Sequence, residues 1–311
     1  MAKPYLTIEQ QISILKEKNL NIKDDEFAKE ILTDIGYFSL IGGYKQSFIN
    51  PMTRKYEEET SIDDILALYR FDEQLRQLTF SYLNKIEQRV QNIIADSFCS
   101  TYGVQQILYL DRNSYSKKAS LSMHVSKLIK ILDNIANKNT DHEYLIYQRK
   151  TYHNVPLWVT IHAMTFGQLS NMYSLLNSRE QSKVSKLYPN VSEKELAQYL
   201  SALTLFRNTC AHKERLFSFH LRKRYFPDTK LHHKMKIPKK GNQYILGKND
   251  YFGLVIAFRY LLPKDDFLSF KSNLTRTIDK YCKKNFRLSK ETLLSQMGMP
   301  SNWKNITRYK P

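Results

Sequence analysis

Cysteine is scarce in this sequence, and no two cysteines have the spacing of a metal site. Cys99, Cys210 and Cys282 lie far apart among the 311 residues and form no Cys-x-x-Cys pair. They are expected to be reduced, mostly buried thiols, and they cannot form a structural zinc site. The sequence therefore predicts an intracellular, cytoplasmic protein that needs no metal or other cofactor.

Glycine and proline are also few, with nine of each, whereas apolar residues make up 42% of the chain. This composition excludes disordered and fibrous proteins, and the shortage of turn residues favours helices over many-stranded sheets. Long apolar runs are missing as well. The most apolar stretch, residues 253–262, is short and is interrupted by Arg259, and no apolar segment at the start has the character of a secretory signal. We therefore expect no contact with a membrane.

Acidic residues are outnumbered, with 30 Asp and Glu against 48 Lys and Arg, which gives a formal net charge of +18. A surplus of this size creates a long-range positive field that attracts polyanions such as nucleic acid. The sequence is also rich in lysine, asparagine and isoleucine, and the codon usage of a low-GC organism would produce the same composition. The position of the charges therefore has to decide between the two explanations.

Helix start signals and apolar periodicity predict an all-α fold. Three pairs of residues have the spacing of a capping box: Thr7 and Gln10, Ser61 and Asp64, and Ser192 and Glu195. The clearest helix extends from Ser61 to about Ser97, with apolar residues at steps of three or four and charged residues, Arg76 among them, on its surface. A stripe of this length needs partners, so this helix should be the spine of a bundle. Further helices are expected over residues 24–33, 121–135, 250–260 and 268–281. One more helix should begin at Pro156, and another should end at about residue 176. An aromatic loop is expected over 35–44 and a second loop over 137–141.

The positive charge is concentrated after His212. Residues 213–248 contain eleven Lys and Arg against two acidic residues, a local balance of about +9 and half of the surplus of the chain. We interpret this segment as an RNA-binding surface, although a solvated basic loop would have the same composition. The candidate RNA-binding residues are Lys213, Arg215, Arg222, Lys223, Arg224, Tyr225, Lys234, Lys236, Lys239 and Lys240.

Two further features stand out within the basic segment. Tyr225, Phe226 and Tyr244 are set among basic residues, where aromatic rings can stack on unpaired bases. The pair His232-His233 has no cysteine or carboxylate at ligand spacing, so we expect an exposed or RNA-facing pair rather than metal ligands.

A dense polar cluster, Arg207, Asn208 and His212, ends the apolar pattern of residues 196–206. Cleavage of a phosphodiester without a metal needs a group that moves protons near neutral pH and a fixed cation that stabilises the charge developing on phosphorus. Histidine suits the first task and arginine the second, and an asparagine amide can orient either group. The pattern Arg-x4-His is weak by itself, because both residues could simply make structural hydrogen bonds near a helix end.

Helix geometry constrains how these three residues could act together. At about 100° per residue, Asn208 and His212 share a face of a helix, whereas Arg207 and His212 are about 140° apart. Either the helix ends before His212, or two copies of the segment meet across a two-fold axis and form a composite site. The second alternative predicts a homodimer.

Residues 207–216 resemble the RNxxAH-x-x-R-L signature of the bacterial Abi family of abortive-infection proteins, the AbiD/AbiF-like group. Further blocks that resemble the family, in the same order, are Lys3–Gln11, Ile35–Leu40 with Gly43 and Tyr44, Tyr69–Arg76, Ile86–Arg89, Pro156–Trp158 and Phe166–Ser170. The resemblance covers roughly residues 3–217. It fades after Phe217, so we expect an Abi-like domain over 1–217 and a basic C-terminal region over 218–311, either as a separate lobe or as part of the same domain.

The resemblance implies a HEPN-like helical bundle in which the Arg and His of the motif act in RNA cleavage. It implies that Arg207 contacts the scissile phosphate, that His212 handles the proton and that Asn208 supports both. Such enzymes are usually homodimers that need no metal and leave a 2′,3′-cyclic phosphate. The resemblance further implies a toxin-like role in phage defence, and some relatives are held in check by a cognate structured small RNA.

Two other hypotheses remain open at this stage. The chain could be a non-catalytic RNA-binding module that holds a small RNA with the same basic surface and the same motif. It could also be a defence regulator that acts by binding a phage or host protein. RNA binding through several phosphates weakens steeply as salt rises, which separates the last hypothesis from the other two.

Overall fold

A computed structural model describes residues 4–285 and 287–311 and confirms the all-α prediction. In these residues the strands are limited to β1 (Lys239–Lys240) and β2 (Gln243–Tyr244), which pair antiparallel in a small hairpin. None of the helices in the described residues combines the length and the apolar character that crossing a membrane requires.

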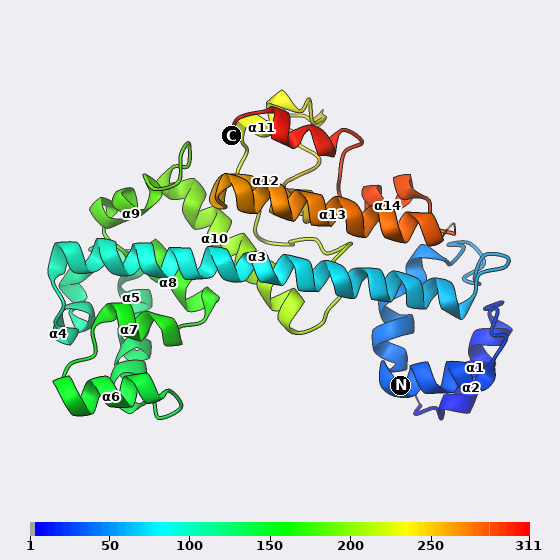
Figure 1. Cartoon of the computed structure of the whole chain (residues 1–311), viewed down its shortest axis with the longest axis horizontal. Helices are drawn as coiled ribbons and strands as arrows, with labels where there is room; N and C mark the ends of the chain where they lie inside the picture. The colour runs from blue at the N-terminus through cyan, green and yellow to red at the C-terminus, as the bar shows by residue number, and fades with distance from the viewer. Residues whose placement is uncertain (1–3, 286) are drawn as a thin grey trace.

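The long helix α3 (Ile62–Tyr102) extends across the whole molecule, as Figure 1 shows. Its 41 residues correspond to a length of about 60 Å. The predicted capping box is present, since the Ser61 hydroxyl accepts from the amide of Asp64 and the Asp64 carboxylate accepts from the amide of Ser61. The helix continues five residues beyond the predicted end, because the first residue that breaks it is Gly103, whose φ is +100°.

At one end of α3 lie α1 (Ile8–Glu17) and α2 (Asp25–Asp34), whose positions match the prediction. The segment after them was expected to be a loop, but residues Phe38–Gly42 form a short helical turn. Leu40, Ile41 and Tyr44 are buried there against α3. The apolar side chains of this segment, which suggested an aromatic loop, therefore serve to anchor the turn to the bundle.

The other end of α3 is covered by a group of shorter helices (Figure 1). They are α4 (Gln106–Leu110), α5 (Ser122–Asp133), α6 (Glu143–Tyr152), α7 (Leu157–Thr160), α8 (Phe166–Leu175) and α9 (Ser178–Ser185). The sequence predicted α5, α7 and α8 but not α4, α6 or α9. Residues Asn134–Lys138 extend α5 by a wider helical turn into the predicted loop.

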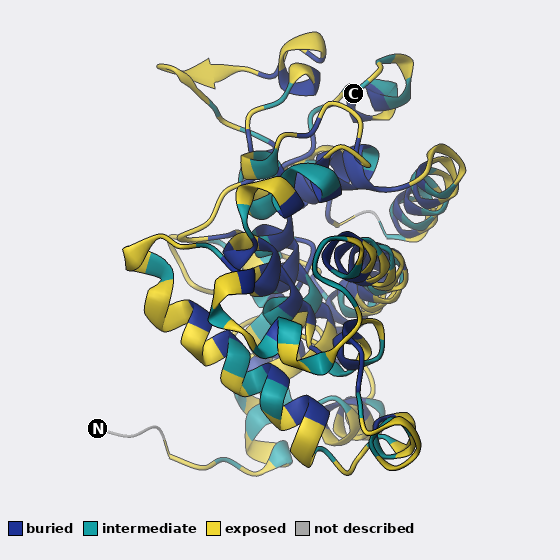
Figure 2. Ribbon diagram, turned by 90° about the vertical axis from the view of Figure 1, so that its left-hand side faces the viewer, coloured by how far each residue is buried: buried dark blue, intermediate teal, exposed yellow. Residues whose placement is uncertain are grey.

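The C-terminal third packs on the same long helix. It contains α11 (Lys230–Lys234), α12 (Tyr251–Leu261), α13 (Lys264–Lys284) and α14 (Lys290–Gln296). Helix α13 lies along α3, with ring centroids 5.3 Å apart for Tyr82 and Phe270 and 5.0 Å apart for Phe71 and Tyr281. Figure 2 shows that the buried residues gather in the middle of the molecule, whereas the β1–β2 hairpin projects from its edge with exposed side chains.

Candidate functional site

The motif lies at the C-terminal end of α10 (Glu193–Ala211), which crosses α3 near its middle (Figure 1). The predicted capping box of Ser192 and Glu195 starts this helix. Its predicted buried face is confirmed, because the side chains at 196, 199, 200, 203 and 206 are all at most 1% exposed. Helix α10 is thus fixed in the core, and its last turn carries Arg207 and Asn208 to the surface of the bundle.

The helix ends directly before His212, which is its C-cap. Ala211 is its last residue, and the amide of His212 still donates to the carbonyl of Asn208 at 2.9 Å. The chain leaves the helix one residue later, at Lys213, whose φ is +56°. The first of the two geometric alternatives is therefore met, but only at the last position. The backbone hydrogen bond keeps His212 on the path of the helix, so it still lies about 140° from Arg207 around the axis.

Arg207 points towards α3 and is half-buried there. Its guanidinium carbon lies 5.6 Å from the centroid of the Phe80 ring, and its Nε is buried without a hydrogen-bond partner. The carboxyl group of Glu87 is close by on the same helix. Partial burial raises the pKa of Glu87, and the positive charge of Arg207 opposes this rise. The arginine thus packs on an aromatic face in the neighbourhood of an acidic side chain, and its buried Nε donor is left unused.

Asn208 and His212 are exposed, about 40° apart around the helix axis. In the described residues neither side chain makes a hydrogen bond to the rest of the protein. Lys213, the next residue, is also exposed. An imidazole and an amide are therefore available to a ligand on one outward face of the helix, and an exposed ammonium group follows directly after them in the chain.

The turn after the motif is held by the buried carboxylate of Asp72 on α3. This carboxylate accepts from the amides of Leu216 and Phe217, at 2.9 and 2.7 Å, and from the hydroxyl of Tyr44 at 2.7 Å. It also forms an ion pair with Arg76 one helical turn later, at 2.7 Å. The four donors compensate for the burial of a charge that would otherwise be costly.

Arg76 and Arg215 complete this support. Arg76 donates to the carbonyl of Glu214 at 3.3 Å, and Arg215 donates to the carbonyl of Gly43 at 2.6 Å. The expectation that Arg76 lies on the surface is wrong, because its side chain is only 5% exposed. Arg215, a candidate RNA-binding residue, is half-buried and bonded within the protein, which gives it a structural task.

Sequence reasoning missed Tyr44, Asp72 and Arg76 as supports of the site. The available signal was the i, i+4 pairing of Asp72 and Arg76 within the apolar face of α3, next to Phe71 and Leu75. A charged pair at such positions indicates a buried network rather than a solvated surface.

Most of the predicted basic residues are exposed, but they do not surround His212. Arg224 donates to the carbonyl of Ser201, which lies eleven residues or about 16 Å before His212 along α10. Lys234 on α11 donates to the carbonyl of Lys310. The other exposed members are Arg222, Lys223, Lys236, Lys239 and Lys240. Apart from Lys213 and the half-buried Arg215, the predicted basic residues therefore lie along residues 222–224, in α11 and the segment after it to residue 236, and in the hairpin.

The structure corrects two expectations about this segment. Phe226 does not face a ligand, since it is buried against Phe206 and Tyr199 with centroids 5.7 and 6.3 Å away. His232 is not exposed either. Its Nδ1 accepts from the amide of Thr229, its Nε2 donates to the carbonyl of Gly247, and burial lowers its pKa from 6.5 to about 4. Its neighbour His233 is exposed, as predicted.

A family model described as Abi-like protein matches residues 30–218, which is more than half of the chain. The matched range contains α3, the Asp72 network and all of α10 with its motif; the predicted opening block 3–11 lies outside it, and Lys3 lies outside the described residues. Comparisons with curated proteins and with solved structures gave no match. The chain thus belongs to the family of Abi-like proteins, and this membership points to a role in abortive infection, a defence against phage.

Proposed function

We propose that this protein is a metal-independent endoribonuclease of the HEPN type that acts in the cytoplasm as a toxin-like component of abortive infection. The observation that carries the proposal is the last turn of α10. It presents His212 and Asn208 to solvent and holds Arg207 against the Phe80 ring, within the electrostatic influence of Glu87. A free imidazole and a positioned guanidinium at the end of one rigid helix are the two groups that metal-free phosphodiester cleavage requires.

In the proposed reaction the ribose 2′-oxygen attacks phosphorus, the bond to the 5′-oxygen breaks, and a 2′,3′-cyclic phosphate forms. His212 takes the proton of the 2′-hydroxyl or supplies one to the leaving 5′-oxygen. Arg207 stabilises the negative charge that develops on the phosphoryl oxygens, and Asn208 orients the phosphate or the imidazole through its amide.

The divergence of Arg207 and His212 supports a homodimer as the active form. On one α10 the two side chains point about 140° apart, and Arg207 is directed towards α3. A two-fold arrangement lets the exposed His212 of one copy approach the Arg207 of the other, and each dimer then contains two equivalent sites.

The positive charge of the protein supports RNA as its ligand. The net charge of +18 and the exposed basic residues along 222–224, α11 and the hairpin suit the capture of a polyanion. We propose that a structured small RNA occupies this surface and regulates the toxin, and that its release or displacement allows cleavage of other RNAs.

The test is an RNA cleavage assay in EDTA with protein that has been freed of bound nucleic acid. His212→Ala and Arg207→Ala should each lower the cleavage rate by about 100- to 10,000-fold. Matched controls are His124→Ala on α5 and Arg70→Ala, which remove an exposed histidine and an exposed arginine elsewhere and should leave the rate unchanged. Equal activity of all five proteins would overturn the assignment of the site.

A mixing experiment tests the composite site. Arg207→Ala and His212→Ala are each inactive alone, but a heterodimer of the two would contain one intact site if Arg and His come from different copies. Mixing equal amounts under exchange conditions should therefore restore about a quarter of the wild-type rate. If both residues of a site come from the same copy, no activity returns.

A non-catalytic RNA-binding defence protein is the alternative, and the partial burial of Arg207 favours it. A guanidinium packed on Phe80 with its Nε enclosed is less accessible to a scissile phosphate than a free one. This alternative predicts tight, salt-sensitive RNA binding with no cleavage by any of the variants. A regulator that binds only a protein would show neither RNA binding nor RNA cleavage.

A further inference from the structure

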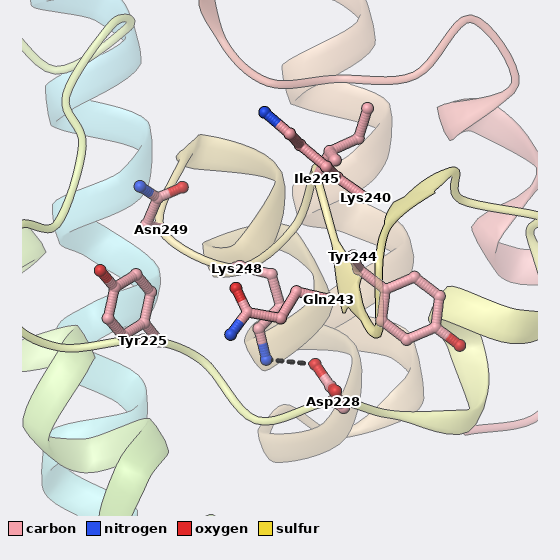
Figure 3. A pocket seen from close by; sticks show the side chains of 8 residues that line it. All are labelled: Tyr225, Asp228, Lys240, Gln243, Tyr244, Ile245, Lys248 and Asn249. Carbon is pink, nitrogen blue, oxygen red and sulfur yellow. Dashed lines mark hydrogen bonds and ion pairs between the residues drawn. The ribbon is translucent and has the colours of Figure 1, made fainter.

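A pocket of about 570 Å³ lies between the β1–β2 hairpin and two loop segments, which is within the usual size range of small-ligand sites. Figure 3 shows the eight residues that line it: Tyr225, Asp228, Lys240, Gln243, Tyr244, Ile245, Lys248 and Asn249. The Gln243 side chain extends from the hairpin towards Tyr225 on the facing loop, and the Tyr244 ring points to the far side of the hairpin.

Backbone hydrogen bonds fix the walls of this pocket. The amide of Leu221 donates to the carbonyl of Asn249, and that of Phe226 donates to the carbonyl of Lys248, both at 2.7 Å. Gly247 is held from two sides, because its amide donates to the buried carboxylate of Asp250 at 2.9 Å and its carbonyl accepts from His232 at 3.1 Å. A pocket with walls fixed in this way needs little reorganisation on binding.

The side chains in the pocket form an aromatic, amide and cationic set. Tyr225 is 52% exposed and offers one ring face, whereas Tyr244 is engaged with the buried ring of His232, 4.8 Å away. The amide of Gln243 has both a donor and an acceptor, and Lys240 supplies an exposed ammonium group. The acidic residue of the pocket, Asp228, is neutralised by an ion pair with Lys248, so it does not repel an anion (Figure 3).

We infer that this pocket binds one unpaired nucleotide of an RNA, with its base stacked on Tyr225, its hydrogen-bonding edge read by Gln243 and Asn249, and its phosphate close to Lys240. A tyrosine ring can stack on the flat face of any base, and carboxamides pair with base edges through a donor and an acceptor. Bases in a duplex are already stacked and paired, so only an unpaired nucleotide can enter. The inference rests on the proposed function in that RNA is the ligand, but it does not require cleavage.

The test measures the affinity of the full-length protein for labelled single-stranded RNAs of about twelve nucleotides and for a duplex of equal length. His212→Ala is the background, so that the RNAs stay intact. Tyr225→Ala should weaken the binding of single strands about tenfold and leave duplex binding within twofold, because loss of one base stack has this size. Tyr225→Phe keeps the ring and should bind like the background protein. Tyr147→Ala, which removes another exposed tyrosine on α6, is the matched control.

Base preference provides a second readout. Affinities for single strands of A, C, G and U should differ for the background protein, and Gln243→Ala should reduce these differences without a uniform loss of affinity. Lys240→Ala should instead weaken all sequences alike and lower the salt dependence.

The outcomes separate this inference from the proposed function. If Tyr225→Ala binds single strands as well as the background protein does, or loses duplex binding equally, charge alone holds the RNA and the pocket inference is wrong. A selective Tyr225 effect in a protein that never cleaves RNA supports the pocket and refutes only the catalytic proposal. Absence of any RNA binding refutes both.

Discussion

Asp72 is a single buried carboxylate that connects the long helix to the turn after the motif. It gathers two backbone amides, a tyrosine hydroxyl and a guanidinium, and these partners come from three separate parts of the sequence. Burial raises its pKa, and Arg76 is the strongest of the groups that oppose this rise. The position of His212 thus depends on a charge that the protein interior tolerates only while its partners are in place.

Removal of Asp72 tests this dependence. Asp72→Ala leaves the Arg76 cation buried and two amides unpaired, so the free energy of unfolding should fall by about 3 to 5 kcal/mol in urea titrations. The control is Asp63→Ala on the exposed face of the same helix, which should cost less than 1 kcal/mol. The double variant Asp72→Ala/Arg76→Ala should be less unstable than the sum of the two single variants, because no unpaired charge remains. A cost below 1 kcal/mol for Asp72→Ala would contradict this account.

Gly247 is held by two titrating groups whose effects on stability have opposite signs. Burial raises the pKa of Asp250 from 3.8 to about 6, so this carboxyl stabilises the fold below pH 4 and loses that contribution as pH rises through 6. The pKa of His232 is lowered from 6.5 to about 4, so its contribution is complete above pH 6.5 and is lost as pH falls through 4. The changes that the two groups make in the free energy of unfolding should therefore largely cancel between pH 4 and pH 6.5.

Asp250→Asn removes the pH-dependent contribution of the carboxyl group and leaves that of His232. The amide can still cap α12, but it no longer takes up a proton, so acidification from pH 6.5 to 4 should cost the variant about 3 kcal/mol more than the wild type. Unfolding free energies measured by denaturant titration at several pH values would show this as diverging curves. Asp265→Asn at an exposed position is the control, and parallel curves for Asp250→Asn would refute the assignment.

At the level of single residues, the sequence predicted the motif but not the buried side chains that support it. Arg207, Asn208 and His212 could be found because they are consecutive or one helical turn apart, and spacing is visible in a sequence. The burial of His232 could not be found, and for Arg76 the i, i+4 pairing with Asp72 was a signal of burial that did not reveal the other partners. Their burial depends on partners that are distant in the chain, such as Tyr44 for Arg76 and Gly247 for His232.

Helices with caps and several turns of apolar periodicity were predictable, whereas most short ones were not; α7 is the exception, because Pro156 marks its start. Both α3 and α10 begin at the predicted capping boxes. By contrast, α4, α11 and α14 have five to seven residues, too few for a periodic stripe, and they form because the bundle packs against them. The same reason explains why the aromatic segment 35–44 adopts helical turns instead of the predicted loop.

Helix α12 contains Gly253, although glycine has a low helix propensity. Gly253→Ala should stabilise an ordinary helix by up to about 1 kcal/mol. Here a Cβ would lie 2.3 Å from the Phe226 ring and 2.9 Å from the carbonyl of Gly247, so we expect a loss of about 1 to 3 kcal/mol in thermal or urea unfolding. Gly43→Ala, where a Cβ meets no atom within 4 Å, is the control and should be neutral or slightly stabilising. Stabilisation by Gly253→Ala would contradict this expectation and would show that the segments carrying Phe226 and Gly247 move away from α12 easily.

The whole molecule is organised around α3, and both parts of the chain bury their apolar surfaces on it. The division at residue 217 came from the point where the family resemblance fades, which reports on sequence and not on packing. The rings of Phe71 and Tyr82 on α3 are covered by Tyr281 and Phe270 of α13. We propose that residues 1–217 and 218–311 fold as one unit.

Truncation tests that proposal. A chain ending at residue 217 leaves the apolar face of α3 open to water, so it should be insoluble or should unfold without a cooperative transition in circular dichroism. Co-expression with residues 218–311 as a separate chain should recover soluble protein. A soluble fragment 1–217 with a cooperative transition would instead establish two domains.

The pairing of α3 with α13 also has a consequence for biosynthesis. The ends of the two helices are about 180 residues apart in the chain. At 5 to 20 residues per second, the ribosome exposes the apolar face of α3 for roughly 10 to 40 s before α13 has been made. Nascent chains must be kept from aggregating during this interval, so the yield of folded protein should depend on translation speed and chaperone supply. Chains that are released before α13 has been made lack this stabilising C-terminal third, and such chains should be substrates for proteolysis instead of folding.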